Sequence, residues 1–172
     1  MAAIDPAIYE EMEISAETTD GSGKTIDLKL GVVKFNYYED LFSPTVTAQM
    51  LIVSAGGATK TDANGNATEE VLDTVYSGLP IRGGERVRIK IKPNSETNVA
   101  LEFDTPEKYF YVSNVARQFS DGSNEIFTLD LVSREAITNE TSRVVKRYPK
   151  ESKISDHVKT IITDRLLSLI HI

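Results

Sequence analysis

The chain has 172 residues and a net charge of −7, which leaves room for one domain with a full core, or one domain with an appendage. It contains no cysteine, so disulfides, thiolate metal ligands and cysteine nucleophiles are excluded. Its apolar runs are far shorter than the roughly 20 residues of a membrane-spanning helix, and the N-terminus carries no recognisable secretory signal. The sequence therefore predicts a soluble protein without a membrane partner.

The charge is unevenly distributed along the chain. Residues 1–80 carry 4 Lys or Arg against 13 Asp or Glu, whereas residues 81–172 carry 15 against 13. Binding to phosphate backbones needs clustered cations, so the acidic first half argues against a nucleic-acid-binding protein. The asymmetry indicates either an ordinary charged surface or a polarity that orients the molecule against a neighbour.

The first part of the chain predicts strands. Residues 7–16 are expected to form a short strand, and two long arms follow at 26–38 and 45–53. The apolar positions of the first arm change phase near 31–33, which predicts an extra residue of the β-bulge kind. The second arm alternates strictly, and Pro44 forces the turn between the arms. A bulged hairpin of this length coils, which favours a β-barrel over a flat sheet.

Residues 54–70 contain almost no large apolar side chain and predict a long flexible loop. Part of this loop fits the calcium-binding loop of an EF-hand, with oxygen-bearing side chains at five ligand positions: Asp62, Asn64, Asn66, Glu70 and Asp73. However, Ala67 stands where the sharp turn needs glycine, and Asp73 is shorter than the usual bidentate glutamate. A solvated surface loop is therefore the preferred interpretation, and calcium is a weak alternative.

The segment 85–92 has the clearest strand pattern in the sequence. Three apolar residues face one way, and four cations face the other: Arg86, Arg88, Lys90 and Lys92. The cations could face water, an acidic protein surface supplied by a second copy of the chain, or nucleic acid. Nucleic acid is the least favoured of the three, because no aromatic residues alternate with the cations.

The last part of the chain changes from strands to helices. A short strand is predicted at 99–103, and a hairpin at 108–119 and 125–132 turns at an Asp-Gly pair. From Ser133 the spacing indicates a capped helical turn, then a connector, then a final helix with Ser152 as its N-cap. The apolar stripe of that helix is unfinished at Ile172, which suggests a longer chain or a partner elsewhere. We therefore divide the chain into a β module at 1–132 and a helical extension at 133–172.

No catalytic motif is recognisable. His157 and His171 lack ligand-spaced partners, no Gly-x-Ser-x-Gly nucleophile motif occurs, and the glycine pairs do not form a phosphate-binding pattern. We therefore expect no catalytic residues and no cofactor, and a protein that is not an enzyme.

Several stretches of the sequence share one resemblance, and they are 37–44 with 79–89, 110–113 with 127–135, Asn139, and 148–167. Together they resemble the central baseplate hub proteins of contractile-tailed bacteriophages. The resemblance is to the N-terminal tail-tube-like module of such a hub, and it covers most of residues 26–167. It implies an α+β fold, mainly β: an antiparallel β-barrel of the phage tail-tube type with a flanking C-terminal helix.

The resemblance also implies a structural protein of the virion, located in the tail baseplate. In that family a trimer, each subunit carrying two such barrels, forms a pseudo-sixfold ring that joins the tail tube protein to the spike protein, while DNA passes through the lumen. This chain has room for one barrel, so a second would have to follow Ile172. We expect the subunit interface to use Tyr37 and Tyr38 together with the four cations of segment 85–92.

Other functions remain open from the sequence. The nearest are other tube modules: a tail tube subunit, a tube terminator, or the hub part of a type VI secretion spike. A β-sandwich adhesion or calcium-binding module would be favoured if the loop at 54–70 became ordered with metal. A fragment of an enzyme is the last alternative.

Overall fold

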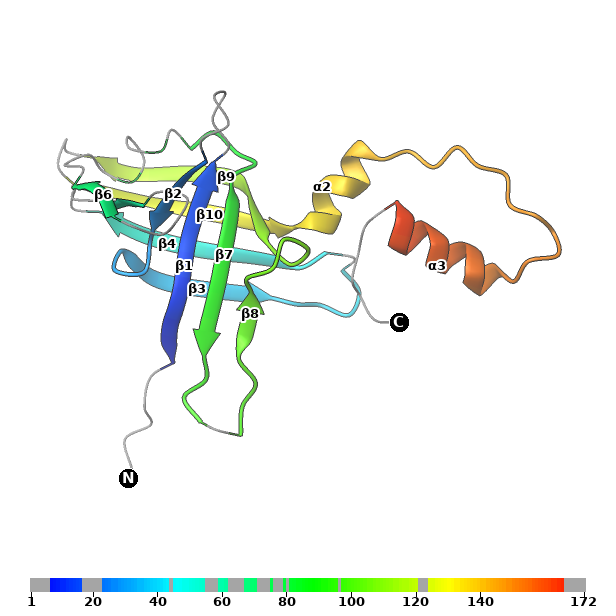
Figure 1. Ribbon diagram of the computed structural model, residues 1–172, viewed down its shortest axis with the longest axis horizontal. Coiled ribbons are helices and arrows are strands. Elements are labelled where there is room, and N and C mark those ends of the chain that lie inside the picture. Colours follow the sequence, from blue (N-terminus) through cyan, green and yellow to red (C-terminus); the bar gives the residue numbers. More distant parts are fainter. Residues whose placement is uncertain are drawn as a thin grey trace.

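A computed structural model describes residues 7–16, 23–43, 45–54, 59–61, 67–70, 75, 79, 81–95, 97–120 and 124–165. These residues form a mainly β structure, in which ten strands make one antiparallel, curled sheet and two helices follow it (Figure 1). None of the described helices has the length and apolar character needed to cross a membrane.

The strands occur in chain order with the following bounds: β1 Ile8–Ala16, β2 Lys24–Asp27, β3 Val32–Tyr38, β4 Thr47–Ser54, β5 Thr59–Thr61, β6 Ala67–Glu70, β7 Arg86–Lys92, β8 Leu101–Phe103, β9 Phe110–Ser120 and β10 Glu125–Ser133. The helices are α2, Arg134–Thr141, and α3, Ile154–Asp164. The order in the sheet is β3-β4-β10-β9-β7-β1-β2-β5-β6, with β8 also paired to β7.

The curl divides the sheet into two layers that enclose the core. Strands β1 and β7 run across the layer of β3, β4 and β10 (Figure 1). The side chains buried between the layers come from both, namely Met12, Ile14, Val87 and Ile89 from one, and Met50, Ile52, Phe127 and Leu129 from the other. Burial of each large apolar side chain contributes on the order of 1.5–3 kcal/mol, so this core is what holds the curl.

Strand β9 makes the corner between the layers. It pairs with β10 along its length, but with β7 only at Phe110 and Tyr111, and β8 takes the place beside β7 from Ile89 onwards. Two register shifts in the β9–β10 ladder add twist at this corner. The result is a half-barrel: β3 and β6 end the sheet, and no ladder joins them among the described residues. The predicted barrel is confirmed as a curled antiparallel sheet, but not as a closed one.

The single arm predicted at 26–38 is wrong. The chain turns at 28–31, so that β2 pairs with β1 and β5 in one layer while β3 pairs with β4 in the other. Gly31 lies in this turn, and a side chain there would place its Cβ 2.9 Å from the carbonyl oxygen of Val53. The predicted irregularity is confirmed, because the β3–β4 register shifts between Val32 and Lys34.

The strands predicted from alternation are confirmed. They include β4 and β7, whose apolar residues are buried at every second position. The loop predicted at 54–70 is wrong in part, because β5 and β6 form a short hairpin beside β2. Such an edge ladder rests on backbone hydrogen bonds and needs no apolar side chains, so apolar patterning did not indicate it.

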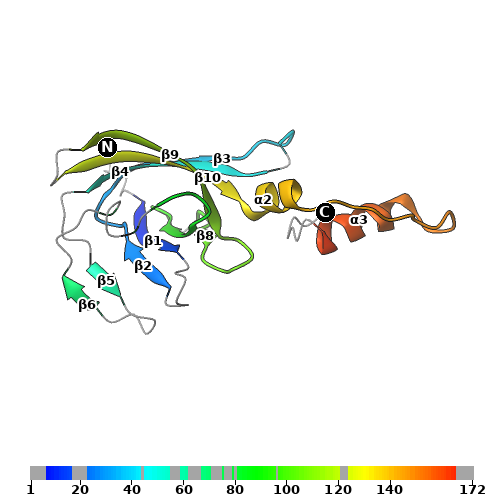
Figure 2. The ribbon, with the colours of Figure 1, turned by 90° about the horizontal axis from the view of Figure 1, so that it is seen from above.

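The helices form an arm, residues 134–165, that projects from one end of the sheet (Figure 2). Ser133 is the N-cap residue of α2, but its hydroxyl accepts the N–H of Val46 and makes no capping bond. The N-cap of α3 is Lys153, so the predicted cap at Ser152 is wrong by one residue. Neither helix contains a buried residue.

Candidate functional site

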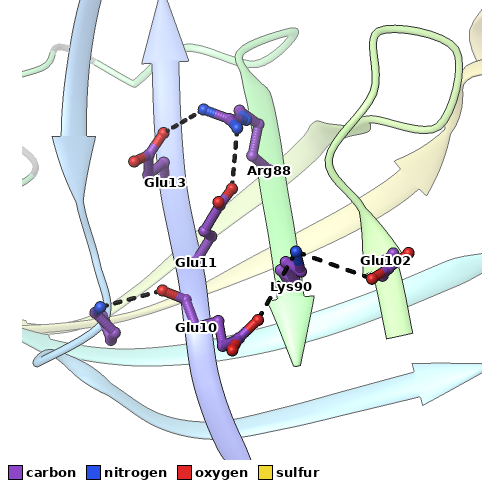
Figure 3. A network of polar contacts seen from close by, with 7 residues as sticks. Glu10, Glu11, Glu13, Arg88, Lys90 and Glu102 are labelled. Atoms are coloured by element: carbon purple, nitrogen blue, oxygen red, sulfur yellow. Dashed lines mark hydrogen bonds and ion pairs between the residues drawn. The ribbon is translucent and has the colours of Figure 1, made fainter. Parts of the chain in front are cut away.

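The cations of β7 lie beside the acidic strand β1 (Figure 3). Arg88 forms two ion pairs of 2.9 Å each, one from each terminal nitrogen, to carboxylates of Glu11 and Glu13. The antiparallel register places these residues on one face, because Glu13 is directly opposite Arg88 and Glu11 is opposite Lys90. The arginine therefore joins the two strands in the manner of a cross-strand pair.

The next two cations along β7, Lys90 and Lys92, also form ion pairs with carboxylates. Lys90 lies 3.8 Å from Glu10 and 3.9 Å from Glu102 of β8, and Lys92 lies 2.6 Å from Glu10. The hydrogen bond from Lys92 lowers the pKa of Glu10, and the same bond raises the pKa of Lys92. Together these contacts form a charge network across β1, β7 and β8.

This network changes the interpretation of the cationic strand. Arg88, Lys90 and Lys92 find their carboxylate partners within the same chain, and the face as a whole is near neutral. The ion pairs are partly exposed to solvent, so each stabilises the fold only weakly. Arg86 is exposed at the start of β7, opposite Tyr111 of β9. The structure thus brings the four predicted residues onto one strand, and Arg88, Lys90 and Lys92 form their ion pairs within the same chain.

The two predicted tyrosines lie at the end of β3. Tyr37 is half-buried, its ring packs against Phe103 with 5.6 Å between centroids, and its hydroxyl donates to Glu39 at 3.0 Å. Tyr38 points to the other face and is exposed. Tyr37 therefore packs on the core side of the hairpin, and the exposed Tyr38 is available for contact with another protein.

The turn after Tyr38 exposes two adjacent large apolar side chains. Asp40 holds it closed, because its side chain accepts the N–H of Phe42 at 2.9 Å and its carbonyl accepts the N–H of Ser43 at 3.0 Å. Leu41 and Phe42 are thereby held in solvent, 93% and 92% exposed. We call residues 39–43 the hairpin tip. Leu41 and Phe42 are not among the predicted interface residues. The sequence shows an apolar pair between Asp40 and Ser43, but it does not show that the pair is exposed.

A groove of about 520 Å³ separates the hairpin tip from the start of α2. Leu41 and Val46 supply apolar surface, and three carboxylate residues also line it: Glu39, Asp40 and Glu135. The groove is open to solvent, and its lining residues do not include an acid paired with a base. Such a surface suits a protein segment better than a small substrate.

The arm carries positive charge, whereas the groove is lined by carboxylates. Its connector, residues 142–153, contains five exposed cations, Arg143, Lys146, Arg147, Lys150 and Lys153, against a single acidic residue, Glu151. Exposed apolar residues lie among them, including Val145 and Ile154.

The arm closes on itself. The hydroxyl of Ser142 donates to the carbonyl of Arg165 at 3.4 Å, and the rings of Tyr148 and His157 are 4.5 Å apart between centroids. His157 is therefore a packing residue within the arm. His171 lies outside the described residues.

The calcium candidates gain no support from the geometry. Asp62, Asn64, Asn66 and Asp73 lie outside the described residues, and Glu70 pairs with Thr59 in the β5–β6 ladder. Within the described ranges, no group of three or more acidic or histidine side chains could hold a metal ion. Comparison of the chain with protein families, curated proteins and solved structures found no match.

Tyr37 offers a direct check of the hairpin geometry. Burial, together with the hydrogen bond and negative charge of Glu39, raises the pKa of Tyr37 to about 12. The neutral phenol is therefore favoured in the folded state, so its stabilising effect is complete below the unfolded pKa of about 10 and is lost as the pH rises to about 12. In an ultraviolet titration we expect Tyr37 to ionise late, in a step that Tyr37→Phe removes and Tyr38→Phe leaves in place. Loss of the late step in Tyr38→Phe instead would contradict the assignment.

Proposed function

We propose that the chain is a structural subunit of a phage tail: the tail-tube-like module of a central baseplate hub, located in the virion. The observation that carries the proposal is where the exposed apolar residues lie. Of the fourteen exposed large apolar residues in the described part of the chain, six lie on two projections, the hairpin tip and the arm, and such surfaces suit contacts between proteins. The choice of a baseplate hub among assembly proteins rests on the resemblance of 37–44, 79–89 and 127–135 to hub proteins.

The proposed geometry is a ring of modules packed side by side. A curled sheet with strand edges at β3 and β6 can extend into the sheet of a neighbouring module, which would complete the half-barrel as a tube wall. The assembly in this proposal is a homotrimer with pseudo-sixfold symmetry, in contact with the tail tube protein on one side and the spike protein on the other. DNA would pass through the lumen without specific binding, and no cofactor is needed.

Co-expression with the tail tube and spike proteins of the same phage tests the proposal. We expect the full-length protein to co-purify with both as a defined complex, visible by native mass spectrometry and electron microscopy as a ring between tube and spike. A protein that assembles alone into long tubes would favour a tail tube subunit instead. A protein that binds neither partner would reject the hub assignment.

A further inference from the structure

We infer that the hairpin tip of one copy docks on the arm of a second copy. This inference deepens the proposed assembly function, on which it rests, by naming the surfaces through which copies meet. The first observation is that the tip is held in one conformation. The Asp40 side chain accepts a hydrogen bond within the turn, and the Tyr37 hydroxyl donates to Glu39. Leu41 and Phe42 are therefore held exposed to solvent. A preformed apolar projection loses little conformational freedom when it binds.

The charges around the tip are unbalanced. Glu39 and Asp40 flank the two apolar residues, and Glu135 lines the opposite side of the groove. No ion pair to these three carboxylates is present within the described part of the chain. The tip and groove therefore present an apolar surface with negative charge around it, and they favour an occupant that is apolar and basic.

The arm has that composition. Val145 is 95% exposed and is followed by Lys146 and Arg147, and Ile154 is 80% exposed directly after Lys153. None of these cations forms an ion pair with another described residue. One chain thus carries both halves of a complementary contact, which identifies a second copy as the occupant.

The arm does not fill the groove of its own chain. Glu135 near its start lines the groove together with Ser133 of β10, and α2 then leads the chain away from the sheet (Figure 2). Its far part, α3, is held to the end of α2 by the contact of Ser142 with Arg165, and to the connector by the contact of Tyr148 with His157. Because each copy offers one tip and one arm, the contact can close as a reciprocal pair or repeat around a ring.

The absence of cysteine makes a cross-linking test direct. Full-length Phe42→Cys and Val145→Cys chains with tags of different mass are mixed and mildly oxidised. We expect a mixed disulfide dimer at roughly tenfold or more the yield of a matched control, because docking raises the local concentration of one thiol near the other. The control replaces Phe42→Cys by Leu30→Cys, since Leu30 is also fully exposed but lies at the opposite end of β3.

Charge reversal provides an independent readout. The double substitution Glu39→Lys and Glu135→Lys reverses charge around the groove and keeps the Asp40 bond that closes the turn. It should abolish the mixed dimer, and a partner carrying Lys146→Glu and Arg147→Glu should restore it. Equal yields from the Leu30→Cys control, or no rescue by the reversed pair, would overturn the inference. So would a chain carrying both cysteines that forms only an internal disulfide, which would show the arm folding back on its own tip. A complex with tube and spike that lacks the 42–145 cross-link would reject this contact while leaving the hub assignment intact.

Discussion

Replacing Phe127 by alanine should lower the free energy of unfolding by about 3–5 kcal/mol, the largest effect that we expect for a single substitution. Phe127 is fully buried in β10, where its ladder partners are Ile52 of β4 and Arg117 of β9. The strand lies near the centre of one layer, so neighbouring side chains have little freedom to collapse into the space. Urea or guanidinium unfolding followed by circular dichroism measures the change.

Phe119→Ala is the matched control, because it removes the same side chain from the adjacent strand β9. Phe119 is 51% exposed, so its loss leaves no enclosed cavity, and we expect a change of about 1 kcal/mol or less. Similar losses for the two variants would contradict the assignment of Phe127 to the core.

Glu85→Ala should lower the free energy of unfolding by about 1–3 kcal/mol. Glu85 is buried just before β7, and its carboxylate accepts the N–H of Arg82 at 2.7 Å and the N–H of Gly83 at 2.9 Å. Gly83 and Gly84 have φ values of 108° and 89°, so the turn depends on a backbone conformation that needs outside support. Alanine would leave both donors without this acceptor.

Glu85→Gln separates hydrogen bonding from the loss of the side chain. The amide keeps one oxygen acceptor at the same position, so the loss should be clearly smaller than for alanine. Chemical unfolding measures both variants, and hydrogen exchange at Gly83 reports on the turn itself. Equal losses for Gln and Ala would mean that the charge, and not the two hydrogen bonds, holds the turn.

The sequence predicted those parts of the fold in which local pattern and packing agree. The alternation in 45–53 and in 85–92 led directly to β4 and β7, since a one-residue slip would expose their buried sets. The Asp-Gly turn likewise placed the β9–β10 hairpin. The change of phase near Gly31 located an irregularity, but the pattern does not distinguish a bulge from a turn into another layer.

The candidate site was harder to predict because it depends on contacts between distant segments. The cations of β7 were read as available for a neighbour, since nothing local shows that the Glu10–Glu13 segment of β1 pairs with them. Exposure of Leu41 and Phe42 was equally hidden, because apolar residues are usually assigned to the core.

The position of β1 in the sheet has a consequence for how the protein is made. Its partner β7 is 75 residues away from Glu13 at Arg88, and β4 meets β10 across 81 residues at Gln49 and Asp130. Such non-local pairing folds slowly, and translation at roughly 5–20 residues per second separates the two strands by about 4–15 s.

During that interval β1 emerges with Met12 and Ile14 but without the strand that will cover them. Its glutamates would lie close to those of any second nascent copy, and like charges on facing strands repel. The acidic face that pairs with Arg88 and Lys92 in the folded chain would therefore disfavour pairing between the β1 strands of two unfinished chains.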